Sequence, residues 1–425
     1  MKQGGVLASF AASFFVCFFL CISTIPTWAA EPIIVGVPTA LNTDYGRDSV
    51  NAVKLAAEEI NANGGVNVGG QKRPIKLIIT DTRDMEPTTP AHDALMATEK
   101  LILQEKPHAM LVGFARSEVF MAGMDLIAKH KIPYLGSYAQ THMFQQQFAK
   151  DPEKYKYIFR VCGYNIIAAK AVTDAIDVLK NEHGMKRAFF ITQDTLLSKG
   201  FVGVLRKHCE KTGWQTVGEA NIASDATDFS AVLSKVKSSK AHMVVVFWDV
   251  AQGGTIMLKQ WTSMRVPSLM TGFVVGACSP RGWDFMGKNI NYVIQTEAPI
   301  GCGIPLKKLP KTRQFVEKFN KAYGKPHGQW LTSASYESVY VLAEAIERAG
   351  TLDPDKLIKE IEKTDYMGVI GRVKFDKNHQ VVYGDDPEKT AVCLAYQWLD
   401  GKMVPIYPPA VAEGKIVLPP GMKIE

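Results

Sequence analysis

Cysteine is scarce in this chain and follows no recognisable spacing. The 425 residues contain seven cysteines, and Cys17 and Cys21 fall in an N-terminal apolar run, which leaves five. None of the five is spaced as CxxC or in another metal-binding pattern, so we expect no metal site. An odd number cannot pair completely within one chain, and two alternatives remain open: one bridge, with Cys278 and Cys302 as the pair closest in sequence, or buried free thiols. The five cysteines are Cys162, Cys209, Cys278, Cys302 and Cys393.

The common catalytic motifs are also missing. No GxGxxG follows the first apolar strand, which runs into Pro38-Thr39-Ala40, and there is no P-loop, GxSxG or HExxH. The nine histidines are dispersed along the chain, as expected of surface and packing residues. These absences disfavour a dehydrogenase or a hydrolase. We therefore expect that the protein is not an enzyme and has no cofactor. A turnover assay would distinguish a binding protein from an enzyme.

Charge of one sign is never concentrated. The formal net charge is +7, and lysine and arginine are interspersed with acidic residues rather than gathered in a basic block. This pattern gives no support for a nucleic-acid partner. A mild positive balance suits an anionic small ligand without requiring one.

Only one apolar run is long. It covers residues 6–25, follows Lys2 and precedes the small residues Thr27 and Ala29. This order predicts a signal peptide over residues 1–29, cleaved near Ala29. A transmembrane anchor is the alternative, because the run approaches spanning length. A lipid-modified Cys21 is disfavoured by the bulky residues before it, and we expect the mature chain to be exported and soluble.

What the sequence does contain is an alternation of apolar strands and amphipathic helices. The length exceeds one domain of ~150 residues, so two or three domains are expected. Strand-like runs at residues 33–37, 76–80 and 108–112 alternate with helical ones, and the pattern restarts near residue 157. Such alternation predicts an α/β fold of two doubly wound, Rossmann-like lobes. We expect a first lobe of residues 30–160 plus 296–366 and a second of 161–295 plus 367–425, joined by a three-segment hinge.

The loop at residues 38–46 precedes a well-marked helix. In an open α/β sheet this loop lies at the carboxyl end of the first strand, where these folds bind ligands. The helix N-terminus behind it suits a carboxylate, and Tyr45 would form an aromatic wall. A surface tyrosine in a turn is the alternative.

Several stretches carry a family resemblance. Val37-Pro38, Tyr45-Gly46 and AAEEINANGGV stand in order near the start; SDATDFSAVLSKVKSSKAHMVVVF and YMGVIGRVKFDKN follow later. Together they resemble the type I periplasmic binding proteins of the leucine/isoleucine/valine-binding family. The resemblance implies two lobes that close on a small molecule and deliver it to an ABC transporter permease in the inner membrane. It also implies a periplasmic protein, which we expect to be a monomer.

The resemblance assigns ligand-binding positions one by one. Tyr45 matches the aromatic residue of the cleft wall, and Ser117 matches a serine that binds the ligand carboxylate. In the next loop Gln140 replaces a threonine of the family. In the second lobe Leu197 replaces an aromatic residue. The further expected site residues are Arg116, Tyr138, Ala139, Trp248, Asp249 and Phe273.

Two departures from the family shape the ligand hypothesis. Arg116 is added beside Ser117, and its guanidinium could hold a carboxylate with two parallel hydrogen bonds. The acid that pairs with an α-ammonium is replaced by Val274, and a buried ammonium without a partner costs several kcal/mol. We therefore expect a carboxylate-bearing ligand with no required ammonium. The alternatives are an amino acid whose ammonium uses Asp249, and a soluble sensor of the same fold.

Overall fold

The computed structural model describes Met1 and residues 31–86, 88–327 and 331–424. The predicted cleavage site at Ala29 lies outside these residues. Among the described residues, no helix has the length and apolar character that crossing a bilayer requires.

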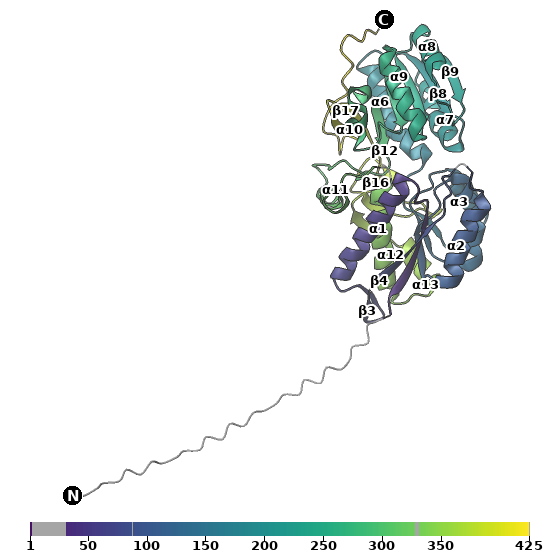
Figure 1. The fold of residues 1–425 in the computed structure, drawn as a ribbon, viewed down its shortest axis with the longest axis vertical. Helices are drawn as coiled ribbons and strands as arrows, with labels where there is room; N and C mark the ends of the chain where they lie inside the picture. Colours follow the sequence, from purple (N-terminus) through teal and green to yellow (C-terminus); the bar gives the residue numbers. More distant parts are fainter. Residues whose placement is uncertain (2–30, 87, 328–330, 425) are drawn as a thin grey trace.

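Two lobes stacked end to end make up the molecule (Figure 1). The first is built on a five-stranded sheet of order β4-β1-β5-β6-β7, in which every pairing is parallel. The parallel arrangement requires crossover helices, and these cover both faces. The strands are β1 (Ile33–Thr39), β4 (Ile75–Asp81), β5 (Ala109–Val112), β6 (Tyr134–Gly136) and β7 (Ile158–Arg160).

The second lobe is built on a seven-stranded sheet of order β18-β17-β12-β11-β10-β8-β9. Its strands from β8 to β12 pair in parallel, and β17 and β18 add an antiparallel edge. The fold is therefore the expected α/β type with two lobes. The strands are β8 (Arg187–Gln193), β9 (Gln215–Ile222), β10 (Met243–Trp248), β11 (Leu269–Val274), β12 (Ile294–Glu297), β17 (Leu394–Leu399) and β18 (Lys402–Tyr407).

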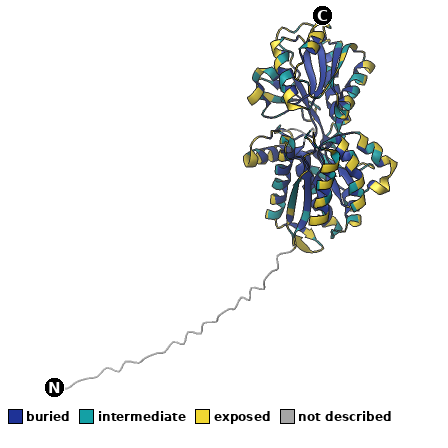
Figure 2. Ribbon diagram, turned by 45° about the vertical axis from the view of Figure 1, so that its right-hand side comes forward, coloured by how far each residue is buried: buried dark blue, intermediate teal, exposed yellow. Residues whose placement is uncertain are grey.

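Helices sandwich each sheet, so the central strands of both lobes are buried (Figure 2). In the first lobe α1 and α12 cover one face and α2 and α3 the other. In the second lobe α6 packs against β12 and β17, and α7 packs against β8 and β10. The helices of the first lobe are α1 (Asp44–Ala62), α2 (Ala91–Glu105), α3 (Ser117–His130), α4 (Met143–Lys150), α5 (Pro152–Tyr155), α11 (Pro310–Tyr323), α12 (Thr332–Ala349) and α13 (Pro354–Glu362). Those of the second are α6 (Asn165–Asn181), α7 (Leu196–Lys211), α8 (Ser230–Ser238), α9 (Ala251–Ser263), α10 (Gly282–Met286) and the 3-10 helix η1 (Gly287–Ile290).

The start of α1 shows how local sequence sets these helices. The side chain of Thr43 accepts a hydrogen bond from Gly46 N at 3.0 Å, which caps the helix N-terminus. At the other end Gly64 and Gly65 both have positive φ, so the chain turns away as the sequence predicts. The helix thereby holds Tyr45 at the end of β1.

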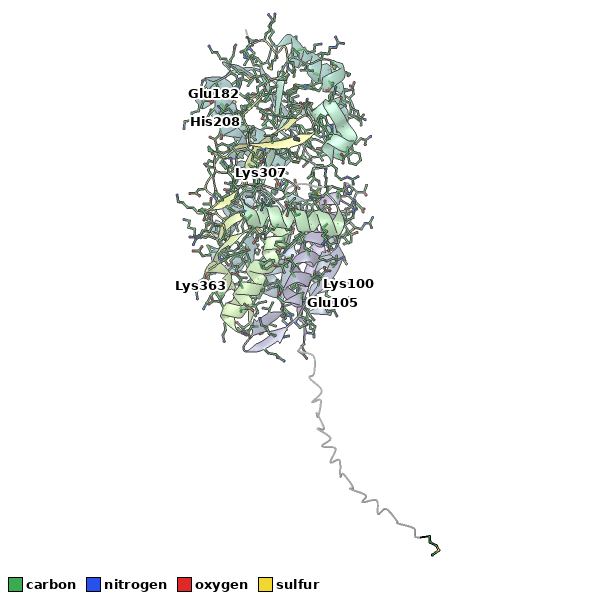
Figure 3. All side chains as sticks on the ribbon, turned by 90° about the vertical axis from the view of Figure 1, so that its left-hand side faces the viewer. Lys100, Glu105, Glu182, His208, Lys307 and Lys363 are labelled. Carbon is green, nitrogen blue, oxygen red and sulfur yellow. The ribbon has the colours of Figure 1, made fainter. Side chains whose placement is uncertain are left out.

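The chain passes between the lobes three times. It leaves the first sheet after β7 and enters α6, and it leaves the second sheet after β12 toward α11 and α12. It returns through a small sheet into β17. The small sheet joins β13 (Asp365–Gly368), β14 (Gly371–Lys374), β15 (Tyr383–Gly384) and β16 (Ala391–Val392), and a hairpin of β2 (Val66–Val68) and β3 (Gln71–Arg73) lies apart. Lys100 and Glu105 mark one lobe and Glu182 and His208 the other (Figure 3). The residue boundaries expected for the lobes remain a prediction.

The five cysteines of the described residues are buried free thiols, so the Cys278–Cys302 bridge that the sequence left open is not formed. The reason is position. Cys278 Sγ lies 3.7 Å from the hydroxyl of Tyr45, across the boundary between the lobes. Cys302 Sγ instead lies 3.1 Å from Ser333 Oγ, at the start of α12.

Candidate ligand-binding cleft

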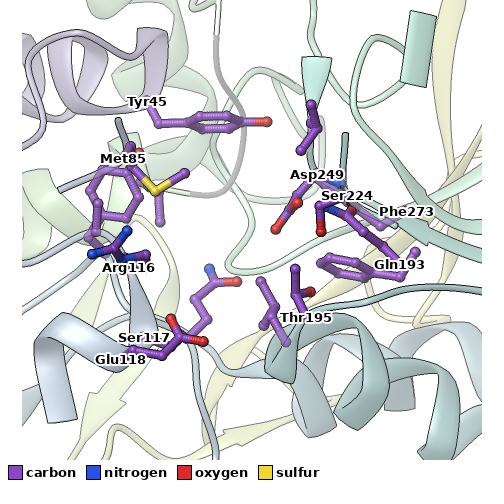
Figure 4. A pocket seen from close by; sticks show the side chains of 17 residues that line it. Tyr45, Met85, Arg116, Ser117, Glu118, Gln193, Thr195, Ser224, Asp249 and Phe273 are labelled. Carbon is purple, nitrogen blue, oxygen red and sulfur yellow. Dashed lines mark hydrogen bonds between the residues drawn. The ribbon is translucent and has the colours of Figure 1, made fainter. Parts of the chain in front are cut away.

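A cavity of about 470 Å³ lies between the lobes, and both contribute walls (Figure 4). Most of its side chains come from loops at the carboxyl ends of parallel strands, where open α/β sheets bind ligands. The first lobe contributes Tyr45, Met85, Ala115, Arg116, Ser117, Glu118, Tyr138, Gln140 and Leu331. The second contributes Gln193, Thr195, Leu197, Ser224, Phe247, Asp249, Val250 and Phe273.

The N-terminus of α3 forms the polar part of the first wall. β5 ends at Val112. Val112 and Gly113 have φ angles of 67° and 85°, and this sharp turn brings the start of α3 to the cavity. A branched residue in this region is strained, and such strain concentrates at functional sites. The buried carboxylate of Asp84 accepts from the N–H groups of Ala115 and Arg116 at 2.8 and 2.9 Å. The loop is therefore fixed before any ligand arrives.

Arg116 and Ser117 stand at this helix start, as the N-cap and the first helical residue. The guanidinium of Arg116 donates to the carbonyl of Thr89 at 3.1 Å and is only partly buried. Arginine has five N–H donors, so the others remain available to a ligand. Together with the partial positive charge of the helix N-terminus, these groups suit an anion.

The loop of residues 137–142 continues the same wall after β6. The hydroxyl of Tyr138 lies 3.1 Å from Thr43 Oγ1, which ties this loop to the start of α1. Gln140 lines the cavity between the two lobes. Ala139 is buried but does not line the cavity.

Asp249 is the acidic residue of the opposite wall, which the second lobe forms. Its backbone N–H donates to Gln193 Oε1 at 2.8 Å, which fixes the turn after β10. Burial raises the pKa of the Asp249 carboxyl. In the described part of the chain, no Lys, Arg or His nitrogen lies within 4.0 Å of this carboxylate. Asp249 thus presents acidic oxygens to the cavity without a cationic partner.

Aromatic rings supply the apolar surface. Phe247 and Phe273 stack with ring centroids 5.0 Å apart at the ends of adjacent strands β10 and β11. Tyr45 projects from the first lobe toward the second (Figure 4), and burial raises the pKa of its phenol well above the usual range. The phenol is therefore neutral and contributes a ring and one hydroxyl.

Comparison with known proteins places this architecture. Residues 32–384 match the family described as periplasmic binding protein. The chain belongs to this family. Its branched-chain amino acid type is supported by relatives named Leu/Ile/Val-binding protein homologues, such as one from Brucella abortus that is 22% identical over 88% of this chain and 90% of its own.

An amino acid binding protein of Pseudomonas aeruginosa is 25% identical to this binding protein over 382 residues, covering 88% of this chain and 92% of its own. Among solved structures, a Streptococcus pneumoniae branched-chain amino acid transporter protein in complex with isoleucine superposes with a TM-score of 0.71 at 19% identity, covering 89% of this chain and all of its own. A solute-binding protein from Rhodopseudomonas palustris in complex with 3,4-dihydroxybenzoic acid gives 0.71 at 18% identity, with 92% and 99% covered. At these identities the two structures establish a shared fold.

The structure of this binding protein brings most expected site residues to one cavity. The members that line it are Tyr45, Arg116, Ser117, Tyr138, Gln140, Leu197, Asp249 and Phe273. Their contacts with a ligand remain a prediction.

Trp248 does not reach the cavity. It is fully buried, and its ring packs edge-on against Phe229 with centroids 4.9 Å apart. Side chains alternate along a strand, so Phe247 faces the cavity and Trp248 points away from it, under Gly253 of α9. Trp248, which was expected to stack on the ligand, therefore does not line the cavity, and the preceding residue Phe247 does.

Several further residues line the cavity without having been expected from the sequence, among them Met85, Glu118, Gln193, Thr195 and Phe247. Gln193 and Thr195 follow β8 directly, so the rule that carboxyl ends of strands face the ligand could have identified them. Met85 and Leu331 come from irregular segments that no sequence pattern marked.

Proposed function

We propose that this protein is an exported, periplasmic solute-binding protein that binds a small carboxylate-bearing ligand between its lobes and delivers it to an ABC transporter permease. The observation that carries the proposal is the pairing of opposite chemistries across one cavity. Arg116, Ser117 and the α3 N-terminus lie on one wall and Asp249 on the other.

The carboxylate is assigned to the first wall. A helix N-terminus, a hydroxyl and a guanidinium together can satisfy the oxygens of a carboxylate with charge-assisted hydrogen bonds. Asp84 holds this loop through Ala115 N and Arg116 N, so little ordering cost falls on binding.

Asp249 favours an amino acid over a simple carboxylic acid. A ligand without a cationic group would leave this partly buried carboxylate unpaired, which is unfavourable unless it takes up a proton. An α-ammonium placed against it would restore the charge balance. Val274, the position where the family acid was expected, is fully buried and does not line the cavity, so its neutrality does not argue against an ammonium.

The ligand body is expected to be apolar. A cavity of about 470 Å³ falls within the ordinary range for small ligands, and most of its surface comes from aromatic and aliphatic side chains. Tyr45, Phe247, Phe273, Leu197 and Met85 would enclose an aliphatic or aromatic group. Closure by bending at the three crossings would complete the enclosure and present both lobes to the permease.

A thermal-shift screen followed by calorimetry tests the proposal. The mature protein is heated with aliphatic and aromatic amino acids, with the matching acids that lack the amino group, and with amides. A ligand at a hundredfold excess over its dissociation constant should stabilise the fold by about 2.7 kcal/mol. We expect amino acids to stabilise and their deaminated analogues to do so less. Stabilisation by neither carboxylate class would refute the proposal, and recovery of the ligand unchanged would separate binding from turnover.

A further inference from the structure

Arg160 is a buried cation that the ligand cleft does not use directly. It ends β7, at the first crossing between the lobes, and is 1% exposed. No carboxylate of the described residues lies within 4.0 Å of its guanidinium, so it has no ion-pair partner there. A buried guanidinium without an acid is costly, and its presence calls for a specific explanation.

Its partners are backbone carbonyls of the loop that lines the cavity. Nη1 donates to Thr141 O and lies 3.5 Å from Ala139 O, so it holds the residues on either side of Gln140. The plane of the guanidinium is held between the rings of Phe144 and Tyr164, at 4.9 and 5.1 Å from their centroids. The planar fork of arginine can span these groups, which the point charge of lysine cannot.

The same side chain is tied to the small sheet beside the hinge. Arg160 Nε donates to Gln380 Oε1 at 2.5 Å, and Gln380 Nε2 donates to Cys162 O at 2.9 Å. Backbone bonds between Arg160 and residues His379 and Val381 complete the joint, at 2.8 and 3.0 Å. Arg160 therefore connects the first crossing with the chain that leads to the third.

The loop that Arg160 holds is bonded to the second lobe as well. Gln140 O accepts from the N–H of Asn165, the first residue of α6, at 3.0 Å. Gln140 Nε2 lies 3.5 Å from Ala298 O, in the crossing that follows β12. One residue thus lines the cavity, contacts the second lobe and contacts a hinge segment.

We propose that Arg160 is a positioning residue for loop 137–142. This loop connects the ligand cleft with the hinge, so the position in which Arg160 holds it sets the angle between the lobes. The inference rests on the proposed function only in taking the cleft as the ligand site. A shift of the loop by a ligand would move Gln140 against Asn165 and Ala298. The lobes would turn in response, because these contacts lie at the crossings.

Small-angle X-ray scattering of the unliganded protein tests the inference without any ligand. Arg160→Met keeps the apolar stem and removes the donors, and we expect its radius of gyration and distance distribution to shift from wild type. Arg187→Met is the matched control, since Arg187 also donates to two carbonyls, Lys240 O and Ser239 O, but within one lobe. Unchanged scattering of a cooperatively folded R160M would overturn the inference, as would an equal shift in R187M.

A second pair of variants covers the case in which R160M does not fold. Gln140→Leu removes the amide that faces Ala298. Gln147→Leu removes an amide that donates to Tyr155 at 2.9 Å and accepts from Lys150 at 3.4 Å, both within the first lobe. We expect Q140L to shift the scattering and Q147L to match wild type; identical profiles for both would contradict the assignment.

A ligand arm uses L-leucine and L-phenylalanine as probes. Wild type should become more compact with a bound probe, and R160M should lose this compaction at saturating probe. If neither probe binds wild type, the proposed amino-acid ligand fails while the unliganded measurements still decide the role of Arg160. Full compaction of R160M by a bound probe would count against the inference.

Discussion

At the scale of single residues, Asp249 decides the charge of the ligand. Burial raises the pKa of its carboxyl in the empty cleft, and an ammonium would favour the ionised form. Below the raised pKa, binding of an amino acid should therefore release a proton from this carboxyl. Affinity should rise with pH up to the raised pKa and level off above it. Calorimetry across acidic to neutral pH with the best amino acid from the screen measures this.

Asp249→Asn should remove both the pH dependence and much of the affinity. Deleting one partner of a buried charge pair costs about 2–5 kcal/mol, which is well over tenfold in the dissociation constant. Asp194→Asn is the control, because Asp194 directly follows the cavity residue Gln193 but pairs with Lys199 at 2.5 Å and is half exposed. Wild-type affinity in D249N would show that the ligand carries no ammonium at this position.

The directions of single side chains were the hardest feature to predict from the sequence. Tyr45 could be placed because loops at the carboxyl ends of strands point toward the ligand, whereas Ser117 and Asp249 were placed by the family resemblance. Trp248 could not be placed in this way. Side chains alternate between the two faces of a strand, so an error of one residue reverses the side on which a side chain lies. The sequence MVVVFW is apolar throughout and buried on both faces, so no alternation marks which side of β10 meets the cavity.

At the scale of elements, two buried glutamates make the hinge region sensitive to pH. Glu297 ends β12 and Glu337 lies in α12, and burial raises the pKa of each from 4.5 to about 8. In each case one oxygen accepts a backbone N–H, from Cys302 or Val369, and the other has no partner among the described residues. The folded protein therefore binds these protons more tightly than the unfolded chain.

The sign of the effect follows from this difference. Stability should be highest near and below pH 4.5 as far as these two groups are concerned, and should fall as pH rises toward about 8. The loss is of the order of a few kcal/mol for each group. Because the two shifts are alike, Glu297→Gln should roughly halve the loss between pH 5 and pH 9, and Glu297→Gln with Glu337→Gln should remove most of it. Denaturant-induced unfolding at several pH values provides the measurement. If the free energy of unfolding of the double variant depended on pH as strongly as that of wild type, the assignment would be contradicted.

Elements were largely predictable, because apolar strands and amphipathic helices alternate with clear boundaries. For example, the sequence predicts helices at residues 312–323 and 333–349, and the structure has them as α11 and α12, within two residues at each start. The tail was harder to predict. Its several prolines, Pro405 among them, predict an extended strap on the surface, yet Pro405 lies inside β18, which forms the edge of the second sheet. An edge strand tolerates proline because one row of its N–H groups has no partner strand.

At the scale of the whole molecule, the cleft joins surfaces from two separately wound lobes, so its geometry depends on the angle between them. One contact across the boundary is the 3.7 Å approach of the Tyr45 hydroxyl to Cys278 Sγ, and the thiol is 1% exposed. Burial raises the pKa of Cys278 to about 12, which makes the thiol unreactive in this arrangement. Cys278 can therefore report on opening of the cleft.

Thiol labelling measures that opening directly. If the empty protein opens, Cys278 should react with a thiol reagent while the other four described cysteines, which are buried within lobes or near the hinge, stay protected. A saturating ligand should slow the reaction, because closure returns Tyr45 to the thiol. Cys278→Ser should abolish the fast reaction, which identifies the site. A Cys278 that reacts equally fast with and without bound ligand would exclude closure at this boundary, and the ligand would then bind to an arrangement of the lobes that it does not change.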